Sequence, residues 1–285
     1  MIIKKKHIFK KKHGQNFLND INILKSILTK IDLDNKNIVE IGAGKGLFTR
    51  LIAQKAKKVL TYEIDKSLKY FLKFDLYPNI FVIYDDVLKR NFNKDFYEYF
   101  NKEDIEMIGN LPYHITIPLI FKILFLDQVK TFTFLIQKEM GLRILSREKK
   151  RNNNSFLSIF LQSLTCIQKI KNFKNTMFFP KPKVDGIMLK FDKLILSKKD
   201  KLFIQNEFFL FIKASFKQKR KKLINNLSNF FDLPKKKILF FFEKYQIPFD
   251  IRAEQINVIE FKKISLLFFN FFEKKSLLIN KFLKK

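Results

Sequence analysis

The pattern of apolar and polar positions predicts a chain that alternates strands with helices over its first two thirds. Short apolar runs rich in β-branched and aromatic residues predict strands at 37–41, 58–62, 80–84, 105–108 and 129–136. Helices are predicted before, between and after these runs, at about 20–30, 47–57, 117–125, 138–150 and 155–167. Because strands that alternate with helices form parallel sheets, this part of the chain is predicted to be an α/β domain.

The pattern changes near residues 194–200, where we place a domain boundary. Beyond it the chain is helical, polar and basic. We therefore predict two domains. Residues 1–193 hold the sheet, and residues 194–285 form a small all-helical, basic C-terminal domain.

A glycine-rich turn links the strand at 37–41 to the helix at 47–57. Gly42 and Gly44 allow the backbone to approach a ligand closely, as in nucleotide-binding strand–turn–helix units. Glu63 ends the next predicted strand, about 20 residues later, where an acid can accept hydrogen bonds from two ribose hydroxyls. The alternative is an ordinary glycine turn with a surface glutamate.

Polar residues recur where successive predicted strands end. Asp85 and Asp86 follow the strand at 80–84, and either carboxylate could accept from an adenine amino group or cap a turn. Asn110 follows the strand at 105–108. In an open α/β sheet the carboxyl ends of the strands border the ligand crevice. We therefore predict that Gly42, Glu63, Asp86 and Asn110 share one site.

The turn from Asn110 to Tyr113 carries the chemistry that decides between ligand classes. Asn110 offers a side-chain acceptor beside the Leu111 carbonyl, and Pro112 favours a conformation in which both point the same way. Tyr113 adds a flat face, so the turn suits an exocyclic amine on a planar ring. The alternative is a strand-end turn with a packed tyrosine.

Phe178 begins a proline-stiffened loop that runs to Asp185. The rigid loop could hold Phe178 as a second stacking surface, although spacing alone favours a core phenylalanine before a turn.

The formal net charge of +30 indicates an anionic polymer partner. An AT-rich genome would also enrich Lys, Phe, Ile and Asn, so part of the charge reflects codon bias. The densest basic cluster, predicted to contact RNA phosphates, comprises Lys217, Lys219, Arg220, Lys221 and Lys222. The alternative is a solvated helix face.

Several classes of protein are disfavoured by what the sequence lacks. It shows no apolar leader with a cleavage site and no uninterrupted apolar run of membrane-spanning length. The single Cys166 excludes an intramolecular disulfide and fits a reducing cytoplasm, and the three histidines have no metal-ligand spacing. We expect a cytoplasmic protein without a metal site, and a monomer by default.

The motifs together resemble the ribosomal RNA adenine dimethyltransferases, most closely the bacterial small-subunit (16S) enzymes. The resemblance runs from Lys11 to about Ile264. Its motifs are Lys12 to Leu18, Val39 to Gly44, Glu63 to Asp65, Asp86 to Leu88, Asn110 to Tyr113, Phe178 to Asp185, Lys217 to Leu227 and Arg252 to Gln255. Ala43 stands where the family often has Pro, and Gly186 where it often has Ser; neither removes a group that the reaction needs.

The resemblance implies a Rossmann-like class I methyltransferase sheet with helices on both faces, and S-adenosylmethionine as methyl donor. It implies that Asn16 and Leu18 line the cofactor site, that Gly42, Glu63 and Asp86 meet its methionine, ribose and adenine parts, and that Asn110 lies between donor and target. The implied reaction is dimethylation of two adjacent adenosines near the 3′ end of small-subunit rRNA during ribosome biogenesis. Rival readings are a large-subunit rRNA adenine methyltransferase and a non-catalytic ribosome-assembly factor that binds RNA.

Overall fold

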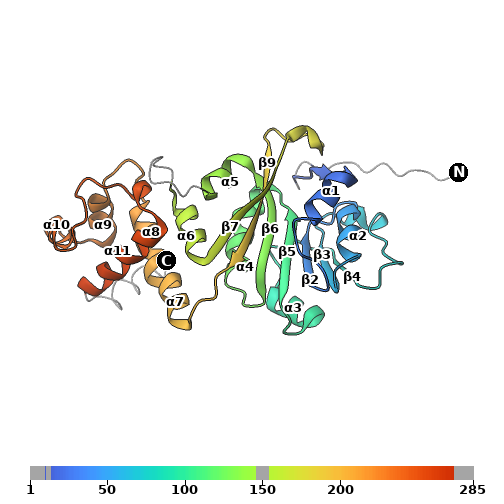
Figure 1. The fold of residues 1–285 in the computed structure, drawn as a ribbon, viewed down its shortest axis with the longest axis horizontal. Helices are drawn as coiled ribbons and strands as arrows, with labels where there is room; N and C mark the ends of the chain where they lie inside the picture. Colours follow the sequence, from blue (N-terminus) through green and yellow to red (C-terminus); the bar gives the residue numbers. More distant parts are fainter. Residues whose placement is uncertain (1–9, 11–13, 146–153, 273–285) are drawn as a thin grey trace. The chain divides into compact units, whose positions relative to one another are not determined.

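The computed structural model describes residue 10, residues 14–145 and residues 154–272 (Figure 1). The chain divides into two compact units. Unit 1 lies within residues 1–141 and 167–193, and unit 2 lies within residues 142–166 and 194–285. The two units are described separately.

A seven-stranded sheet forms the centre of unit 1 (Figure 1). Its strands are β2 (Asn37–Ile41), β3 (Lys58–Tyr62), β4 (Ile80–Ile83), β5 (Ile105–Asn110), β6 (Val129–Gln137), β7 (Thr165–Phe173) and β9 (Gly186–Lys193). The spatial order is β4-β3-β2-β5-β6-β9-β7. The strands from β4 to β6 in this order are parallel, and β9 runs antiparallel to β6.

The register of the parallel strands brings their carboxyl ends to one edge. Ile41 on β2 pairs with Tyr62 on β3 and with Gly109 on β5, while Tyr62 pairs with Ile83 on β4. The residues that follow these positions in sequence are the glycine turn, Glu63, the two aspartates and Asn110. The shared edge predicted from sequence is therefore present.

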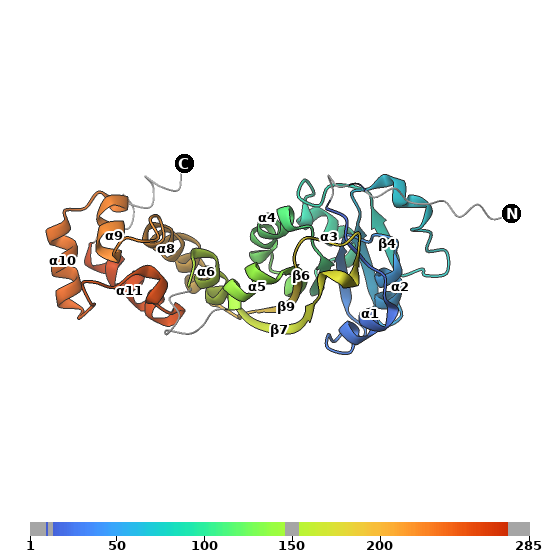
Figure 2. The same cartoon turned by 90° about the horizontal axis from the view of Figure 1, so that it is seen from above.

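Helices cover both faces of the sheet. They are α1 (Ile21–Leu28), α2 (Leu47–Ala53), α3 (Phe92–Phe100), α4 (Tyr113–Leu124) and α5 (Lys138–Leu145), with 3₁₀ turns η2 (Lys66–Tyr70) and η4 (Asn175–Met177). Figure 2 shows α1 and α2 on one side of the sheet and α3 and α4 on the other. A short second sheet pairs β1 (Phe17–Leu18) with β8 (Phe178–Phe179) in antiparallel fashion.

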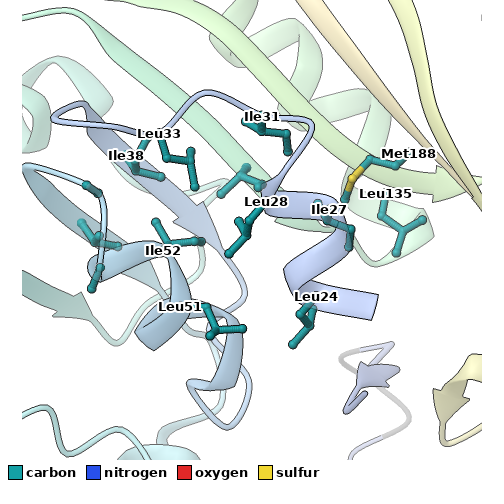
Figure 3. Close-up of a cluster of buried hydrophobic side chains, with 14 of the residues drawn as sticks. Leu24, Ile27, Leu28, Ile31, Leu33, Ile38, Leu51, Ile52, Leu135 and Met188 are labelled. Carbon is teal, nitrogen blue, oxygen red and sulfur yellow. The ribbon is translucent and has the colours of Figure 1, made fainter. Parts of the chain in front are cut away.

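Helix α1 fixes the chain that leads into the glycine turn. Asp20 caps it by accepting hydrogen bonds from the backbone of Asn22 and Ile23. Its apolar face packs against α2 and the sheet in the cluster of Figure 3, which includes Ile27, Leu28 and Ile52. Each fully buried aliphatic side chain contributes roughly 1.5–3 kcal/mol, so α1 anchors the segment just before it.

The structure differs from the sequence predictions at three helices. The helix predicted to reach residue 167 ends at Leu164, and β7 begins at Thr165. From Thr165 onward the backbone hydrogen-bonds to β9 as an added strand of the sheet, which replaces the hydrogen bonds of a longer helix. Helix α4 begins at Tyr113 rather than near residue 117, and α3 was not predicted. The predicted helix end at 146–150 and the loop at 151–153 lie outside the described residues.

Unit 2 is helical in its described residues. It contains α6 (Phe156–Leu164), α7 (Lys198–Phe203), the π-helical turn η5 (Ile204–Phe208), α8 (Phe209–Ser215), α9 (Leu223–Phe231), α10 (Lys235–Lys244), η6 (Ala253–Gln255) and α11 (Val258–Phe271). The rings of Phe156 and Phe160 contact Phe209 edge-on, and the Lys262 ammonium donates to the Ser163 carbonyl. These contacts place α6 in unit 2, whereas the boundary drawn at residue 194 from sequence leaves it in the first domain.

Candidate active site

A cavity of about 110 Å³ lies at the carboxyl edge of the sheet. Four loops after strands and the segment before α1 contribute to its wall. Gly42, Gly44, Glu63, Asp85, Asp86 and Asn110 come from the strand ends, and residues 14–17 come from the N-terminal side. Residues that the sequence spreads over a hundred positions thus line one space.

Glu63 is held at the centre of this wall. Its two carboxylate oxygens accept hydrogen bonds from the backbone N–H of Gly44 at 2.9 Å and of Asp65 at 2.8 Å. The side chain is buried, and burial raises its pKa above the ordinary value, although the two backbone donors oppose that shift. Because each carboxylate oxygen has a second lone pair, a fixed Glu63 can also accept from vicinal hydroxyls in the cavity.

The two aspartates after β4 differ in their contacts. Asp85 pairs with Arg90, which also forms a two-pronged ion pair with the buried Asp95. The Tyr62 hydroxyl donates to the same Asp95 at 2.9 Å. One oxygen of Asp86 accepts the backbone N–H of Leu88 at 3.0 Å, and no donor among the described residues reaches the other. Asp86 therefore has a carboxylate oxygen that can accept a hydrogen bond from a ligand.

The segment before α1 closes one side of the cavity. A side chain at Gly44 would meet the Phe17 ring at 2.6 Å, and one at Gly14 would meet Pro112 at 3.1 Å. Both glycines have positive φ, so other residues would be strained there as well as crowded. The ring of Phe17 thus lies directly on the glycine turn, a role that sequence reasoning did not assign.

The side-chain carboxylate of Asp65 anchors this segment. It accepts hydrogen bonds from the side chains of Lys10, Gln15 and Ser67. Burial acts to raise the pKa of Asp65, but these donors outweigh it and hold that pKa well below its usual range. The sequence singled out Asp65 only as part of a family motif, because Gln15 and Asp65 are far apart along the chain.

Asn110 is oriented by a hydrogen bond to the same segment. Its Nδ2 donates to the Asn16 carbonyl at 2.7 Å, so its Oδ1 points to the other side of the amide. No donor among the described residues reaches that oxygen. The Leu111 side chain is buried, and the Leu111 backbone N–H donates to the Leu135 carbonyl at 3.2 Å, which fixes the peptide between Asn110 and Leu111.

A second, smaller cavity adjoins the first. It is lined by Asn110, Leu111, Tyr113 and Phe178, and it shares Gly14, Asn16 and Asn110 with the first cavity. Phe178 is buried against Phe173 with ring centroids 6.3 Å apart, so it belongs to the core and to the cavity wall at once. Pairing of Leu18 with Phe178 joins the N-terminal segment to this wall.

Leu18 lies on a third cavity of about 60 Å³ rather than on the first. This cavity shares Phe17, Gly42, Gly44 and Asn110 with the first and is also lined by Glu40. Glu40 is buried and accepts a hydrogen bond from the Thr49 hydroxyl at 2.6 Å. Burial raises the pKa of Glu40 to about 7, so its carboxyl group titrates near neutrality.

The basic cluster lies in unit 2, on the turn between α8 and α9. Lys217, Lys219, Arg220, Lys221 and Lys222 are all exposed, and none forms an ion pair with another described residue. The buried Asn226 holds the turn by donating to the carbonyls of Ser215 at 2.7 Å and Gln218 at 3.1 Å. The turn therefore presents uncompensated positive charge on a fixed backbone.

The described residues contain neither a metal-binding cluster nor a membrane-spanning helix. No three His, Cys, Asp or Glu side chains there are grouped so that they could hold a metal ion. Across the same residues no helix has the length and apolar character needed to traverse a bilayer.

A model of the ribosomal RNA adenine dimethylase family matches residues 6–268. The chain belongs to this family. Ribosomal RNA small subunit methyltransferase A of Onion yellows phytoplasma is 48% identical over 270 residues, which cover 93% of this chain and 98% of that protein. The protein of the same name from Mycoplasmopsis pulmonis is 37% identical over 262 residues, covering 90% and 98%.

Solved structures agree with the family assignment. A dimethyladenosine transferase from Plasmodium falciparum superimposes with a TM-score of 0.74 at 26% identity, covering 89% of this chain and 97% of that one. The 23S rRNA methyltransferase ErmE gives a TM-score of 0.67 at 20% identity over 88% and 99%, which shows the fold alone. The predicted Rossmann-like methyltransferase fold with a helical C-terminal part is confirmed.

Proposed function

We propose that this adenine dimethylase transfers methyl groups from S-adenosylmethionine to the N6 amines of two adjacent adenosines near the 3′ end of small-subunit rRNA. The product is N6,N6-dimethyladenosine, formed in the cytoplasm during small-subunit biogenesis by a monomer. The observation that carries the proposal is Asn110, whose oriented amide borders both the first and the second cavity.

The residues of the first cavity fit S-adenosylmethionine. Glu63 offers fixed carboxylate oxygens for ribose hydroxyls, and Asp86 has an oxygen for the adenine amino group. A Cβ at Gly42 would have only the Asn110 carbonyl oxygen within reach, at 4.0 Å, so the absent side chain leaves room for a ligand. When bound, S-adenosylmethionine supplies an electrophilic methyl group on its sulfonium.

The groups that line the second cavity suit an adenine ring, and the cavity, of about 10 Å³, must open to admit one. Tyr113 and Phe178 supply aromatic surface, and the Asn110 Oδ1 and Leu111 carbonyl can accept the two N–H hydrogens of the exocyclic amine. That amine is a poor nucleophile because its lone pair is delocalised into the ring. Two acceptors favour a pyramidal nitrogen whose lone pair faces the donor, and positioning supplies most of the rate.

The arrangement also permits a second methylation. After the first transfer one N–H remains, and either acceptor can still orient it. The methylated ammonium is acidic and loses its proton readily, so no side chain is required as a general base.

The direct test is mass spectrometry of rRNA from cells with and without this protein. We expect dimethyladenosine at two adjacent positions near the 3′ end of small-subunit rRNA only when the protein is present. Loss of the modification from large-subunit rRNA instead would favour the rival substrate, and unchanged rRNA in both subunits would leave an assembly factor.

Replacement of Asn110 by Ala tests the role proposed for the Asn110 amide. Because the variant removes one acceptor, we expect kcat to fall by at least about 100-fold, the usual cost of one preorganised hydrogen-bonding group. Isothermal titration should still detect binding of S-adenosylmethionine, since Glu63 and Asp86 remain. Turnover close to that of the wild type would contradict the role.

A further inference from the structure

The strand that carries Phe178 presents a second phenylalanine in the opposite direction. Phe178 is 7% exposed and lines the second cavity, whereas Phe179 beside it is 60% exposed. Alternation along a strand explains the difference. Both residues pair with β1, Phe179 with Phe17 and Phe178 with Leu18, so the backbone under the exposed ring is fixed at both positions.

The backbone that carries the exposed ring borders the second cavity, while the ring itself points away from it. Phe178 and Pro182 both line that cavity, and Phe179, Pro180 and Lys181 connect them. Asp185, at the end of the loop that begins at Phe178, fixes that loop because its carboxylate accepts a hydrogen bond from the Asn175 N–H at 3.0 Å. The same carboxylate pairs with Lys138 at 3.4 Å. The loop that joins Phe178 to Pro182 is therefore anchored beside the second cavity.

Positive charge flanks the exposed ring. Lys181 and Lys183 are exposed and form no ion pair with another described residue, whereas Lys174, 73% exposed, pairs with Asp185 at 3.9 Å. An aromatic surface framed by unpaired cations is the combination by which proteins hold single-stranded nucleic acid: bases stack on the ring, and the cations contact the phosphates.

We propose that Phe179 stacks against the base of a nucleotide next to the target adenosine, while Lys181 and Lys183 contact the adjoining phosphates. The inference rests on the proposed function and adds a residue that holds the flanking RNA. Phe178 then serves the target base and Phe179 its neighbour, from consecutive positions on one strand. Because the target pocket is untouched, Phe179 acts on the affinity for RNA and not on the chemical step.

Substitutions at Phe179 separate stacking from simple apolar contact. Loss of one base–aromatic stack raises KM for RNA about tenfold. We expect that rise for Phe179→Ala and Phe179→Leu, with kcat and the Kd of S-adenosylmethionine unchanged, and near-wild-type KM for Phe179→Trp. The matched control is Tyr97→Ala, which removes a 64% exposed aromatic ring from α3 and should leave KM unchanged.

An abasic nucleotide identifies the partner of the ring. Binding is measured by fluorescence anisotropy with a synthetic single-stranded RNA that carries one central adenosine, in the presence of S-adenosylhomocysteine. An abasic site on the 5′ or the 3′ side should weaken binding by the wild type about tenfold at one of the two positions. The same abasic RNA should bind the Phe179→Ala variant with the same Kd as the intact RNA does.

The outcomes distinguish this inference from the proposed function. If the wild type methylates small-subunit rRNA but Phe179→Ala has the same KM, or if Phe179→Leu matches Phe179→Trp, stacking by Phe179 is wrong while the enzyme assignment stands. If both abasic RNAs weaken the variant as much as the wild type, the ring has no base partner. If the wild type methylates no rRNA, the proposed function fails and the inference fails with it.

Discussion

At the scale of single residues, two acidic side chains in unit 1 behave in opposite ways because their neighbours differ. Asp65 accepts hydrogen bonds from Lys10, Gln15 and Ser67, so it stays ionised and holds the N-terminal segment. Glu40 is equally buried, but it receives the neutral Thr49 hydroxyl and lies near the charge of Glu63. Burial without a cation favours the protonated form of Glu40.

Glu40 predicts a pH dependence of stability. Its pKa rises from 4.5 to about 7 on folding, so the folded state binds the proton more tightly. The stabilisation is complete below pH 4.5 and is lost as pH rises through about 7. Urea unfolding at pH 4.5 and 7.5 should therefore show a loss of about 3 kcal/mol from this group in the wild type.

Glu40→Gln serves as the control, because a neutral amide keeps the shape and does not titrate. The difference in unfolding free energy between wild type and variant should shift in favour of the variant as pH rises across this window. A difference that stays constant with pH would show that Glu40 is ionised throughout.

At the scale of elements, the segment of residues 14–18 acts as one wall of the cofactor cavity, although it contains only a two-residue strand. It is held at three points: Gln15 bonds to Asp65, the Asn16 carbonyl accepts from Asn110, and Leu18 pairs with Phe178. Each contact reaches a different loop of the sheet edge. The segment therefore couples the first cavity to the second.

Asp65→Asn tests this coupling. The change removes the charge that binds Lys10, while the amide keeps the size of the side chain. We expect the Kd for S-adenosylmethionine to rise about tenfold, a cost typical of breaking one charge-assisted contact. Amide hydrogen exchange at residues 15–18 should become faster, because the segment opens more often.

A matched substitution is Asp34→Asn, which removes a carboxylate that pairs with Lys55 at the surface. Exposed pairs contribute little, so neither affinity nor exchange in the segment should change. Equal behaviour of the two variants would mean that Asp65 does not hold the wall.

At the scale of the whole molecule, cations differ in how many of them are paired with carboxylates. In unit 1 several cations are paired with carboxylates, among them Lys36 and Arg90. The turn between α8 and α9 in unit 2 instead presents five exposed cations without carboxylate partners among the described residues. Codon bias explains an abundance of lysine but not this difference in pairing.

Replacement of Lys217, Lys219, Arg220, Lys221 and Lys222 by Gln should weaken binding to small-subunit rRNA. Each phosphate contact contributes roughly 0.7 to 0.9 to the slope of log K against log salt, so the slope should become shallower by several units. Filter binding at a series of salt concentrations measures it. Replacement of the exposed Lys235, Lys236 and Lys237 on α10, which removes three charges instead of five, controls for loss of surface charge outside the turn, and an equal loss in that variant would place the RNA contact elsewhere.

The sequence alone was sufficient for the fold class and for the shared edge of Gly42, Glu63, Asp86 and Asn110. These predictions depend on local patterns: apolar runs define the strands, and parallel topology then sends every carboxyl end to the same side. The position of a residue relative to its own strand was enough, and no distant contact had to be known.

Only the tertiary structure decided what depends on residues far apart in the chain. Phe178 is buried in the core, as spacing alone favoured, and the pairing of β1 with β8 also brings it to the wall of the second cavity. Contacts with α8 and α11 bring α6 into unit 2, and a neighbouring strand turns residues 165–173 into β7. For α6 and β7 a hydrogen-bonding or packing partner outweighs the local preference, and no pattern within a short stretch of sequence reveals that partner.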